Sequence, residues 1–233
     1  MQVAERTAAL KRIAIFAGLL DPAIGRIADG CKWQTYDSGQ TIVDYQNPSI
    51  DILFLLAGKA RVVNYSADGK SVVFVDLVPP AMFGEIGAID HQPRSASVEA
   101  IEPCTVASLS ARSFEQLMSR EPTVATGVLR HLAGEVRRLS ERVFEFSTMM
   151  VQNRVQAELI RRAAEAGQMR GEAVLSPAPS LSDIADRIST HREAVSRELS
   201  RLTTLGLLHR EHGDLRITDL ARLTKLVNEA KGE

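Results

Sequence analysis

Residues 83–96 read Phe-Gly-Glu-Ile-Gly-Ala-Ile-Asp-His-Gln-Pro-Arg-Ser-Ala, and this stretch decides more about the fold than any other. Gly84 lets the backbone approach a ligand closely, because glycine has no Cβ. Residues 85–89 can form one helical turn, and the free N–H groups at its start favour an anion. Arg94, nine positions after Glu85, offers a planar fork suited to a phosphate, with the Ser95 hydroxyl beside it. A sugar hydroxyl between the two would give the Glu85 carboxylate something to accept from.

Short strand-like runs separated by turn signals surround this stretch, from residue 31 to residue 110. Residues 60–65 alternate apolar and polar, Asp68-Gly69 is typical of a hairpin turn that needs positive φ, and residues 72–78 form the next run. Many short strands at this spacing predict a small antiparallel barrel or roll. An apolar run at residues 13–20 is too short for a membrane span and is interpreted as a short helix packed on this domain.

From residue 113 onwards the hydrophobic period becomes helical. Apolar residues recur at spacings of 3 and 4 on one long helix, at Leu129, Leu132, Val136, Leu139, Val143, Phe146 and Met150. This is a narrow a/d seam with Arg and Glu on its flanks, which favours a two-helix coiled coil and hence a two-fold dimer. The alternative is a helix that lies on its own barrel.

Residues 180–202 show the pattern of two short helices joined by a turn. Helix starts are predicted at Ser180 and at Thr190, the second as a capping box with Glu193. The expected contact joins two apolar sets across the turn, namely Ile184, Ala185 and Ile188 against Val195, Leu199 and Leu202. This is a helix-turn-helix pattern.

The exposed side of the second helix carries residues that suit base edges. Arg192, Glu193, Ser196 and Arg197 lie near its N-terminal end, which meets the bases in such motifs. Arginine pairs bidentately with guanine, and glutamate accepts from cytosine N4. Arg201, one turn further on, is expected at phosphate or in solvent. Residues 207–217 then predict a two-stranded wing that turns at residues 212–214, with residues 151–166 as a preceding amphipathic helix and 167–179 as a loop.

Bulk charge does not indicate a nucleic-acid binder, since the 233-residue chain has a formal net charge of −1. Residues 151–233 hold 13 Lys and Arg against 12 Asp and Glu, so the case for DNA depends on where the arginines lie. The composition is that of an ordinary folded chain without a membrane span or secretion signal, and we expect a cytoplasmic protein.

Enzyme and metal chemistry find little support in the sequence. Cys31 and Cys104 are too few for an iron–sulfur cluster or a disulfide framework, and Cys104 is expected to be a buried, inert thiol. His209 and His212 lack further ligands nearby, so we expect no metal and no haem. The sequence shows no Walker loop or nucleophile elbow, and Glu85 with Arg94 forms a binding pair rather than a catalytic one.

Over essentially its full length the chain resembles the Crp/Fnr family of bacterial transcription regulators. Residues 83–96 look like the phosphate-binding cassette of cyclic nucleotide-binding domains, and Arg-Glu-x-x-Ser-Arg at 192–197 resembles the family's recognition helices. The resemblance implies an α+β protein: a β-roll domain over residues 1–120, a dimerisation helix over 121–150 and a winged helix-turn-helix domain over 151–233. It also implies a homodimer that binds an inverted-repeat operator in double-stranded DNA and works with RNA polymerase.

The resemblance assigns roles in the nucleotide pocket residue by residue. Glu85 would take the ribose 2′-OH, and Arg94 with Ser95 would hold the cyclic phosphate, next to backbone N–H groups around Gly84, Ile86 and Ala96. The base would meet the long helix at Leu139 and Ser140, where Leu139 replaces a hydroxyl residue found in the best-known cAMP-responsive members. Glu135 could accept from guanine, so cAMP is the first candidate and cGMP stays open.

The resemblance also implies the DNA contacts and leaves two alternatives. Arg192, Glu193 and Arg197 would read bases, with His191, Ser196 and Arg201 beside them at bases or phosphates. His209, Arg210 and Arg216 of the wing are candidates for backbone contacts. One alternative is a regulator of the same type that needs no ligand or answers another signal. The other is a cyclic nucleotide-sensing module of a partner enzyme, which would have no use for the helix-turn-helix.

Overall fold

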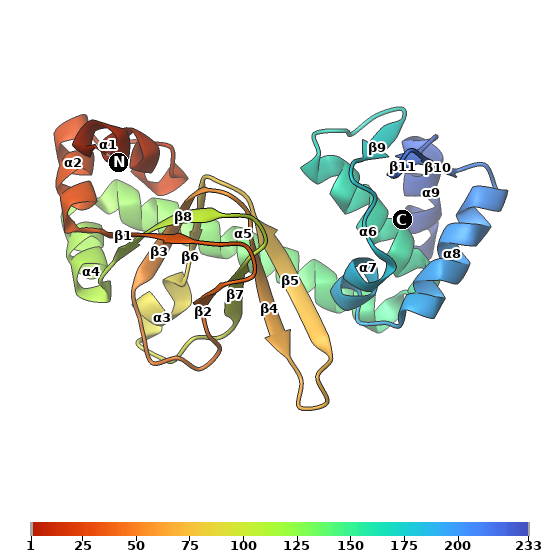
Figure 1. Ribbon diagram of the computed structural model, residues 1–233, viewed down its shortest axis with the longest axis horizontal. Coiled ribbons are helices and arrows are strands. Elements are labelled where there is room, and N and C mark those ends of the chain that lie inside the picture. Colours follow the sequence, from red (N-terminus) through yellow and green to blue (C-terminus); the bar gives the residue numbers. More distant parts are fainter. Residues whose placement is uncertain (1, 233) are drawn as a thin grey trace. The chain divides into compact units, whose positions relative to one another are not determined.

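The computed structural model describes residues 2–232, and the chain divides into two compact units, Met1–Glu135 and Val136–Glu233. Figure 1 labels the helices and strands of both units. Each unit has its own hydrophobic core. The N-terminal unit contains, in chain order, α1 (Val3–Lys11), the 3₁₀ turn η1 (Ala14–Phe16), α2 (Asp21–Gly30), β1 (Lys32–Tyr36), β2 (Thr41–Val43), β3 (Ile52–Ala57), β4 (Ala60–Tyr65), β5 (Ser71–Leu77), β6 (Ala81–Phe83), α3 (Glu85–Asp90), β7 (Ser97–Ala100), β8 (Cys104–Leu109) and α4 (Ala111–Arg120).

The boundary between the units falls inside the long helix α5 (Pro122–Thr148). The C-terminal unit continues with α6 (Val151–Glu165), β9 (Ala173–Leu175), α7 (Leu181–Arg187), α8 (Arg192–Thr204), β10 (Leu208–Glu211), β11 (Asp214–Ile217) and α9 (Leu220–Lys231). No helix within residues 2–232 combines the length and the apolar character that a membrane crossing requires.

Two four-stranded antiparallel sheets form the roll of the N-terminal unit, in the orders β1-β8-β3-β6 and β2-β7-β4-β5. Strand β3 is apolar at every position, because both of its faces are covered. Leu53 and Leu55 point into the core between the sheets, whereas Ile52, Phe54 and Leu56 belong to the core under the helices. Because neighbouring side chains on a strand point to opposite faces, a strand covered on both faces needs apolar residues throughout.

Helices close one side of this roll. Phe16, Ile24, Phe114 and Val124 come from η1, α2, α4 and α5, and all four side chains are buried in the same cluster as Phe54. Figure 1 shows α2 and α4 at one end of the roll, and the β4–β5 hairpin extending from it. The predicted helix over residues 13–20 is only the short turn η1, because α2 begins directly after it with a proline in its first turn.

The core of the C-terminal unit lies between helices α6, α7, α8 and α9 and a small sheet. Ile184 and Ile188 on the α7 side contact Val195, Leu199 and Leu202 of α8 in one buried cluster, as the sequence predicts. The β10–β11 hairpin is the predicted wing, with His212 and Gly213 at positive φ in its turn. Strand β9 adds a third strand to the wing, and the sequence analysis wrongly placed only a loop there.

The predicted capping box at Thr190 is also wrong. Ser189 has a φ of 51°, the Thr190 N–H bonds back to the carbonyl of Ala185, and α8 begins at Arg192 with His191 as its N-cap residue. At the start of α7 the prediction is confirmed, since the Ser180 hydroxyl accepts from the Asp183 N–H at 3.0 Å. The α+β class, with its antiparallel roll, long helix and winged helix-turn-helix, is therefore confirmed despite these local differences.

Candidate functional site

Arg94 is held inside the N-terminal unit by three protein acceptors. Its Nη2 donates to the Asp51 carbonyl at 2.7 Å, its Nη1 to the Gly84 carbonyl at 3.0 Å, and its Nε to the Ser49 hydroxyl at 3.2 Å. The residue is only 4% exposed, and burial lowers the pKa of its guanidinium, an effect that the charges of Asp51 and Glu85 oppose. Among the residues that the structure describes, three of the five N–H groups of the guanidinium have acceptors, and the other two are left for an anion.

Gly84 is what permits this arrangement. It caps α3 with a φ of 76°, a conformation that side chains with a Cβ rarely adopt. A Cβ at this position would lie 2.5 Å from Nη1 of Arg94 and 2.9 Å from Cδ1 of Leu53. The glycine therefore permits the backbone turn into α3 and also leaves space for the Arg94 side chain.

Glu85 follows Gly84 directly and is buried at the start of α3. Its Oε1 lies 3.7 Å from Nε2 of His131 on α5, and its charge is felt by the Arg94 guanidinium. Glu85 and Arg94 are thus brought into one site around Gly84, but the carboxylate forms its ion pair with His131. The sequence analysis did not single out His131, although it lies one turn before Glu135 on the same helix.

The strand that follows Arg94 is fixed by Asn64 of β4. The Asn64 amide donates to the Ser95 carbonyl at 3.1 Å and accepts from the Ser97 N–H at 3.2 Å. Ser95 is exposed, Ala96 is half-buried, and Ile86 is exposed on α3. The Asn64 side chain therefore sets the backbone on both sides of Ala96, where the predicted phosphate contacts lie.

The candidate base contacts lie on α5. The Ser140 hydroxyl donates to the carbonyl of Val136 in its own helix at 2.8 Å, and Leu139 is 43% exposed. Glu135 is half-buried, and its charge adds to the larger effect of the Glu85 carboxylate, which raises the pKa of His131. Leu139 and Ser140 belong to the C-terminal unit and Glu135 to the N-terminal unit.

Helix α8 presents its charged side chains at its N-terminal end. Arg192 is about 71% exposed and Glu193 about 62% by side chain, and Nε of Arg192 donates to Oε1 of Glu193 at 3.1 Å. The pKa of Glu193 is lowered by its own backbone N–H first and by Arg192 next, so its carboxylate is an acceptor at neutral pH. His191 and Arg197 are exposed and Ser196 is half-buried, while Val195 and Leu199 on the other side of the helix are buried.

Arg201 is exposed, and its side chain also has a partner within its own helix. Its Nε and Nη2 each donate to the Glu198 carboxylate at 2.8 Å, which raises the pKa of the Arg201 guanidinium. Glu198 is buried and also accepts from the Gln156 amide at 2.6 Å, so this pair ties α8 to α6. The structure thus gives Arg201 a partner within the helix-turn-helix.

Two protein-family models match the chain. The cyclic nucleotide-binding domain model covers residues 33–121, and the Crp-like helix-turn-helix domain model covers residues 153–226. The chain belongs to the Crp/Fnr family. This is a family of transcription regulators that combine a cyclic nucleotide-binding domain with a DNA-binding domain.

Relatives and solved structures agree with this Crp/Fnr assignment. The chain is 24% identical over 217 residues to the CRP-like cAMP-activated global transcriptional regulator of Mycobacterium tuberculosis, covering 93% of this chain and 97% of that protein. FixK2 from Bradyrhizobium japonicum has a TM-score of 0.70 at 23% identity, covering 84% of this chain and 96% of FixK2. The c-di-GMP responsive global regulator CLP of Xanthomonas campestris has a TM-score of 0.73 at 18% identity, covering 84% and 98% of the two chains.

The apolar seam on the α5 of this Crp/Fnr protein is largely open. Leu129, Val136 and Val143 are each between 63% and 67% exposed within the chain. Met150 was expected on the same helix, but α5 ends at Thr148 and Met150 is the extended N-cap residue of α6, where it is 72% exposed. Phe146 is 37% exposed, with the guanidinium carbons of Arg142 and Arg154 lying 5.3 and 5.4 Å from its ring centroid. Leu132 departs from the pattern, because it is half-buried against the core of the N-terminal unit.

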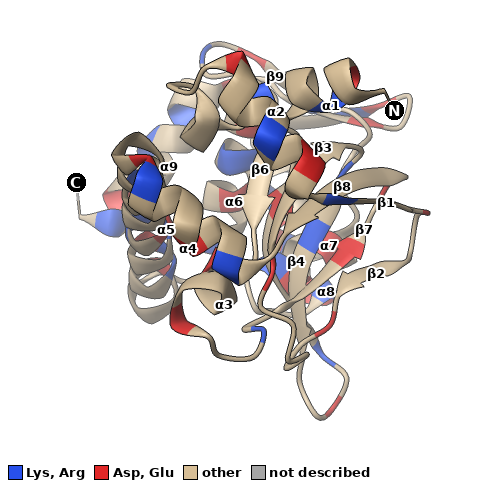
Figure 2. Ribbon diagram, turned by 90° about the vertical axis from the view of Figure 1, so that its left-hand side faces the viewer, with Lys and Arg blue, Asp and Glu red and all other residues tan. Residues whose placement is uncertain are grey.

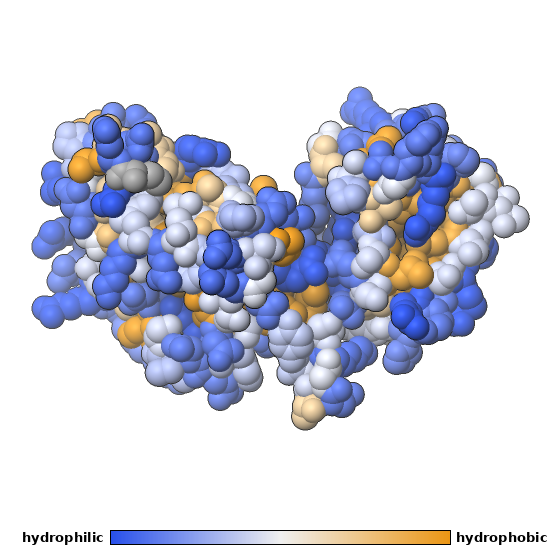
Figure 3. Space-filling view, viewed as in Figure 1, coloured by the Kyte–Doolittle hydropathy of each residue, from blue (hydrophilic) through white to orange (hydrophobic). Residues whose placement is uncertain are grey.

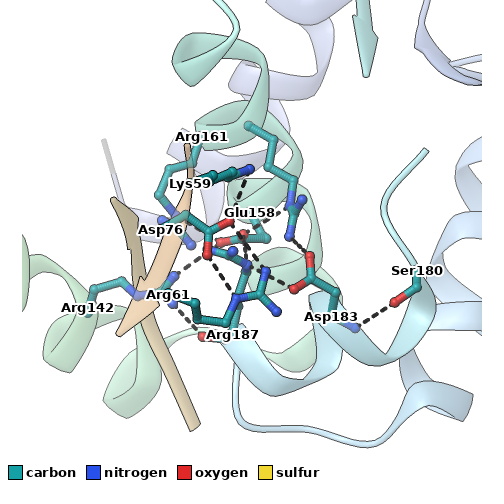
Figure 4. Close-up of polar contacts among 10 residues, drawn as sticks. Lys59, Arg61, Asp76, Arg142, Glu158, Arg161, Ser180, Asp183 and Arg187 are labelled. Carbon is teal, nitrogen blue, oxygen red and sulfur yellow. Dashed lines mark hydrogen bonds and ion pairs between the residues drawn. The ribbon is translucent and has the colours of Figure 1, made fainter. Parts of the chain in front are cut away.

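An ionic cluster that the sequence analysis missed joins the helices of the C-terminal unit. Glu158 of α6 is buried and accepts from Arg161 at 3.1 Å, from Arg162 at 3.2 Å and from Arg142 of α5 at 3.4 Å. Arg142 also donates to the carbonyl of Arg187 at the end of α7 (Figure 4). Arg161 and Arg162 lie on the same helix as Glu158, but the contacts with Arg142 and Arg187 join separate helices and leave no pattern in the sequence.

The surface carries charged residues of both signs. Basic and acidic residues are interspersed in the view of Figure 2, consistent with the net charge of −1. In the N-terminal unit, for example, Asp76 of β5 pairs with Lys59 at 3.3 Å and with Arg61 at 2.9 Å (Figure 4).

Apolar residues are visible beside α8 in the C-terminal unit (Figure 3). A groove of about 500 Å³ lies there and is lined in part by Leu181 and Leu199.

Proposed function

We propose that this protein is a homodimeric transcription regulator that binds a cyclic nucleotide, cAMP first and cGMP second, and then binds an inverted-repeat operator in double-stranded DNA. The Arg94 guanidinium carries the proposal. It lies buried against the carbonyl of Gly84 and within the electrostatic influence of the Glu85 carboxylate, and two of its N–H groups have no acceptor among residues 2–232. A buried cation beside an acceptor for a sugar hydroxyl suits a ribose cyclic phosphate and few other metabolites.

Nucleotide binding is tested by calorimetry on protein stripped of ligand, with cAMP and cGMP as probes. We expect Arg94→Ala to abolish binding, because the phosphate loses its charged donor. Arg112→Ala removes an exposed arginine of α4 and should leave the affinity unchanged. Unchanged affinity in Arg94→Ala would show that the nucleotide does not bind at Arg94.

Operator binding is supported by the exposed Arg192, Glu193 and Arg197 at the start of α8. Arg192→Ala and Arg197→Ala should each cost about 1–3 kcal/mol of operator binding and relax specificity at one base. Gel-shift titrations on the operator and on scrambled DNA measure both effects, with Arg222→Ala of α9 as the control for a lost positive charge. Equal losses on both DNAs would assign these arginines to phosphates instead of bases.

The dimer is supported by the open seam on α5, because exposed apolar residues at a heptad spacing need a matching surface. Two copies would present two reading helices, which accounts for an operator with two-fold symmetry. Action through RNA polymerase completes the proposal and is supported by two relatives that carry the name cAMP-activated global transcriptional regulator.

A second candidate is a regulator of the same architecture that needs no nucleotide or answers another signal. It is favoured by the three protein acceptors that already hold the Arg94 fork, and by Leu139 at a position where a hydroxyl residue would meet adenine. The CLP regulator of Xanthomonas campestris, described as c-di-GMP responsive, illustrates such a change of signal within the fold. Full operator affinity of ligand-free protein, unchanged by cAMP or cGMP, would favour this candidate.

A further inference from the structure

His131 of α5 is the ion-pair partner of Glu85, the residue that the proposed function assigns to the sugar. The distance from its Nε2 to Oε1 of Glu85 is 3.7 Å, and the two side chains are only 32% and 11% exposed. Both residues lie within the N-terminal unit, His131 on α5 and Glu85 on α3. A carboxylate oxygen held from one side is restricted in orientation, and its other oxygen is left to accept from a second donor.

The charges around the imidazole favour its protonated form. Glu85 acts most strongly and Glu135, one turn further along α5, acts in the same direction, so the pKa of His131 is raised although burial opposes this. The charge of Glu85 also acts on the Arg94 guanidinium, as does that of Asp51. His91, the residue directly after α3, and Glu115 of α4 form a separate pair at 2.8 Å. Both side chains are exposed.

We propose that His131 belongs to the nucleotide site, where its imidazole orients the Glu85 carboxylate toward the sugar hydroxyl and its protonation sets the affinity for the nucleotide. This inference rests on the proposed function, since it requires that a cyclic nucleotide occupies the site between Glu85 and Arg94. His131 is a positioning residue, because it acts on the ligand through Glu85.

The sign of the pH dependence follows from charge. A cyclic nucleotide is a monoanion at its phosphate, so it binds best when the site carries the most positive charge. Protonated His131 neutralises Glu85, whereas neutral His131 leaves an unbalanced carboxylate beside the phosphate. The bound anion raises the pKa of His131 further, so binding takes up a proton and affinity falls as the pH rises through that pKa.

The test measures cAMP affinity by calorimetry on the full chain between pH 6 and pH 8.5. Wild-type affinity should fall by roughly tenfold over this interval, the change that one unit of extra pKa shift in the complex produces. His131→Gln keeps an N–H donor without a titratable group, so its affinity should vary much less with pH. His131→Leu removes the donor and should bind more weakly than His131→Gln at every pH. His91→Gln is the matched control and should keep the wild-type profile, since His91 pairs with Glu115 instead of Glu85.

The outcomes separate this inference from the proposed function. Wild-type binding with an unchanged pH profile in His131→Gln, or wild-type affinity in His131→Leu, overturns the role of His131 and leaves the nucleotide pocket standing. Absence of cyclic nucleotide binding by the wild type overturns both. Thermal melts of each variant at pH 6 confirm that the compared proteins are folded.

Discussion

Gly84 and Arg94 depend on each other, because the space beside the glycine is occupied by the arginine's Nη1. In Gly84→Ala the left-handed backbone costs about 1–2 kcal/mol of stability, and the new methyl group also displaces the guanidinium. We therefore expect a large loss of cAMP affinity in calorimetry, together with a lower melting temperature. Gly69→Ala provides the matched control: its φ is 78° and its Cβ meets nothing within 4 Å. It should be destabilised in the same way and bind nucleotide normally, and equal losses of affinity in both variants would contradict this account.

The pairing of His131 with Glu85 also predicts how stability responds to pH. The pKa of His131 is raised in the folded protein, so the folded state holds this proton more tightly than the unfolded chain does. The resulting stabilisation is fully present below the unfolded value of about 6.5 and is lost as pH rises through the folded pKa. The free energy of unfolding of the wild type should exceed that of His131→Gln by more at pH 6 than at pH 9, measured by urea titration. A difference that is the same at both pH values would show that the imidazole contributes only through packing.

Glu158 is the residue on which the helices of the C-terminal unit converge, since α5, α6 and α7 all send arginines toward it. Glu158→Gln leaves these cations without their common counter-charge in a buried position, and we expect a loss of roughly 3 kcal/mol or more in the free energy of unfolding. Guanidinium chloride would screen the effect, so urea titration is the suitable measurement. Glu165→Gln on the exposed end of the same helix should change the stability by less than about 0.5 kcal/mol. Operator affinity should also fall in Glu158→Gln, because the ion pair that links α7 to α6 through Glu158 is lost.

Elements with a strong period could be predicted from the sequence, and elements fixed by distant partners could not. The buried side of α8 follows from Val195, Leu199 and Leu202 at helical spacing. Strand β9 is only three residues long and exists because it pairs with β11, some forty positions away. The start of α8 was misplaced because Ser189 adopts positive φ, which shifts the cap from Thr190 to His191.

The candidate site divides in the same way. The glycine, the carboxylate and the arginine of residues 84–94 could be named from their order alone, and the structure brings them together around Gly84. His131 comes from a helix more than forty positions later, and only the fold brings it to Glu85. The pair that Arg201 forms with Glu198 could not be predicted, because Glu198 is buried although a sequence pattern assigns a charged residue to the surface.

At the scale of the whole molecule, the proposed function requires that two copies meet along α5. A glutamate in place of Val136 puts a charge on each copy at the centre of the exposed seam, where the two would face one another. We expect Val136→Glu to be monomeric in sedimentation equilibrium. Its operator affinity should fall steeply, because each half-site is then bound alone. Nucleotide binding through Arg94 should persist, since that contact lies within one chain.

Gly134→Glu is the control for this charge, because it adds the same carboxylate on the same helix, at a position where a Cβ meets nothing within 4 Å. It should remain dimeric and bind the operator like the wild type. The spacing of the half-sites provides an independent check, since a two-fold dimer requires them one or two helical turns apart, at about 34–36 Å per turn. Moving one half-site by five base pairs turns it to the opposite side of the duplex, which should abolish the gain in affinity that the wild type has over Val136→Glu. Operator binding that is insensitive both to this shift and to Val136→Glu would mean that a single copy reads the DNA, and the seam would then need another partner.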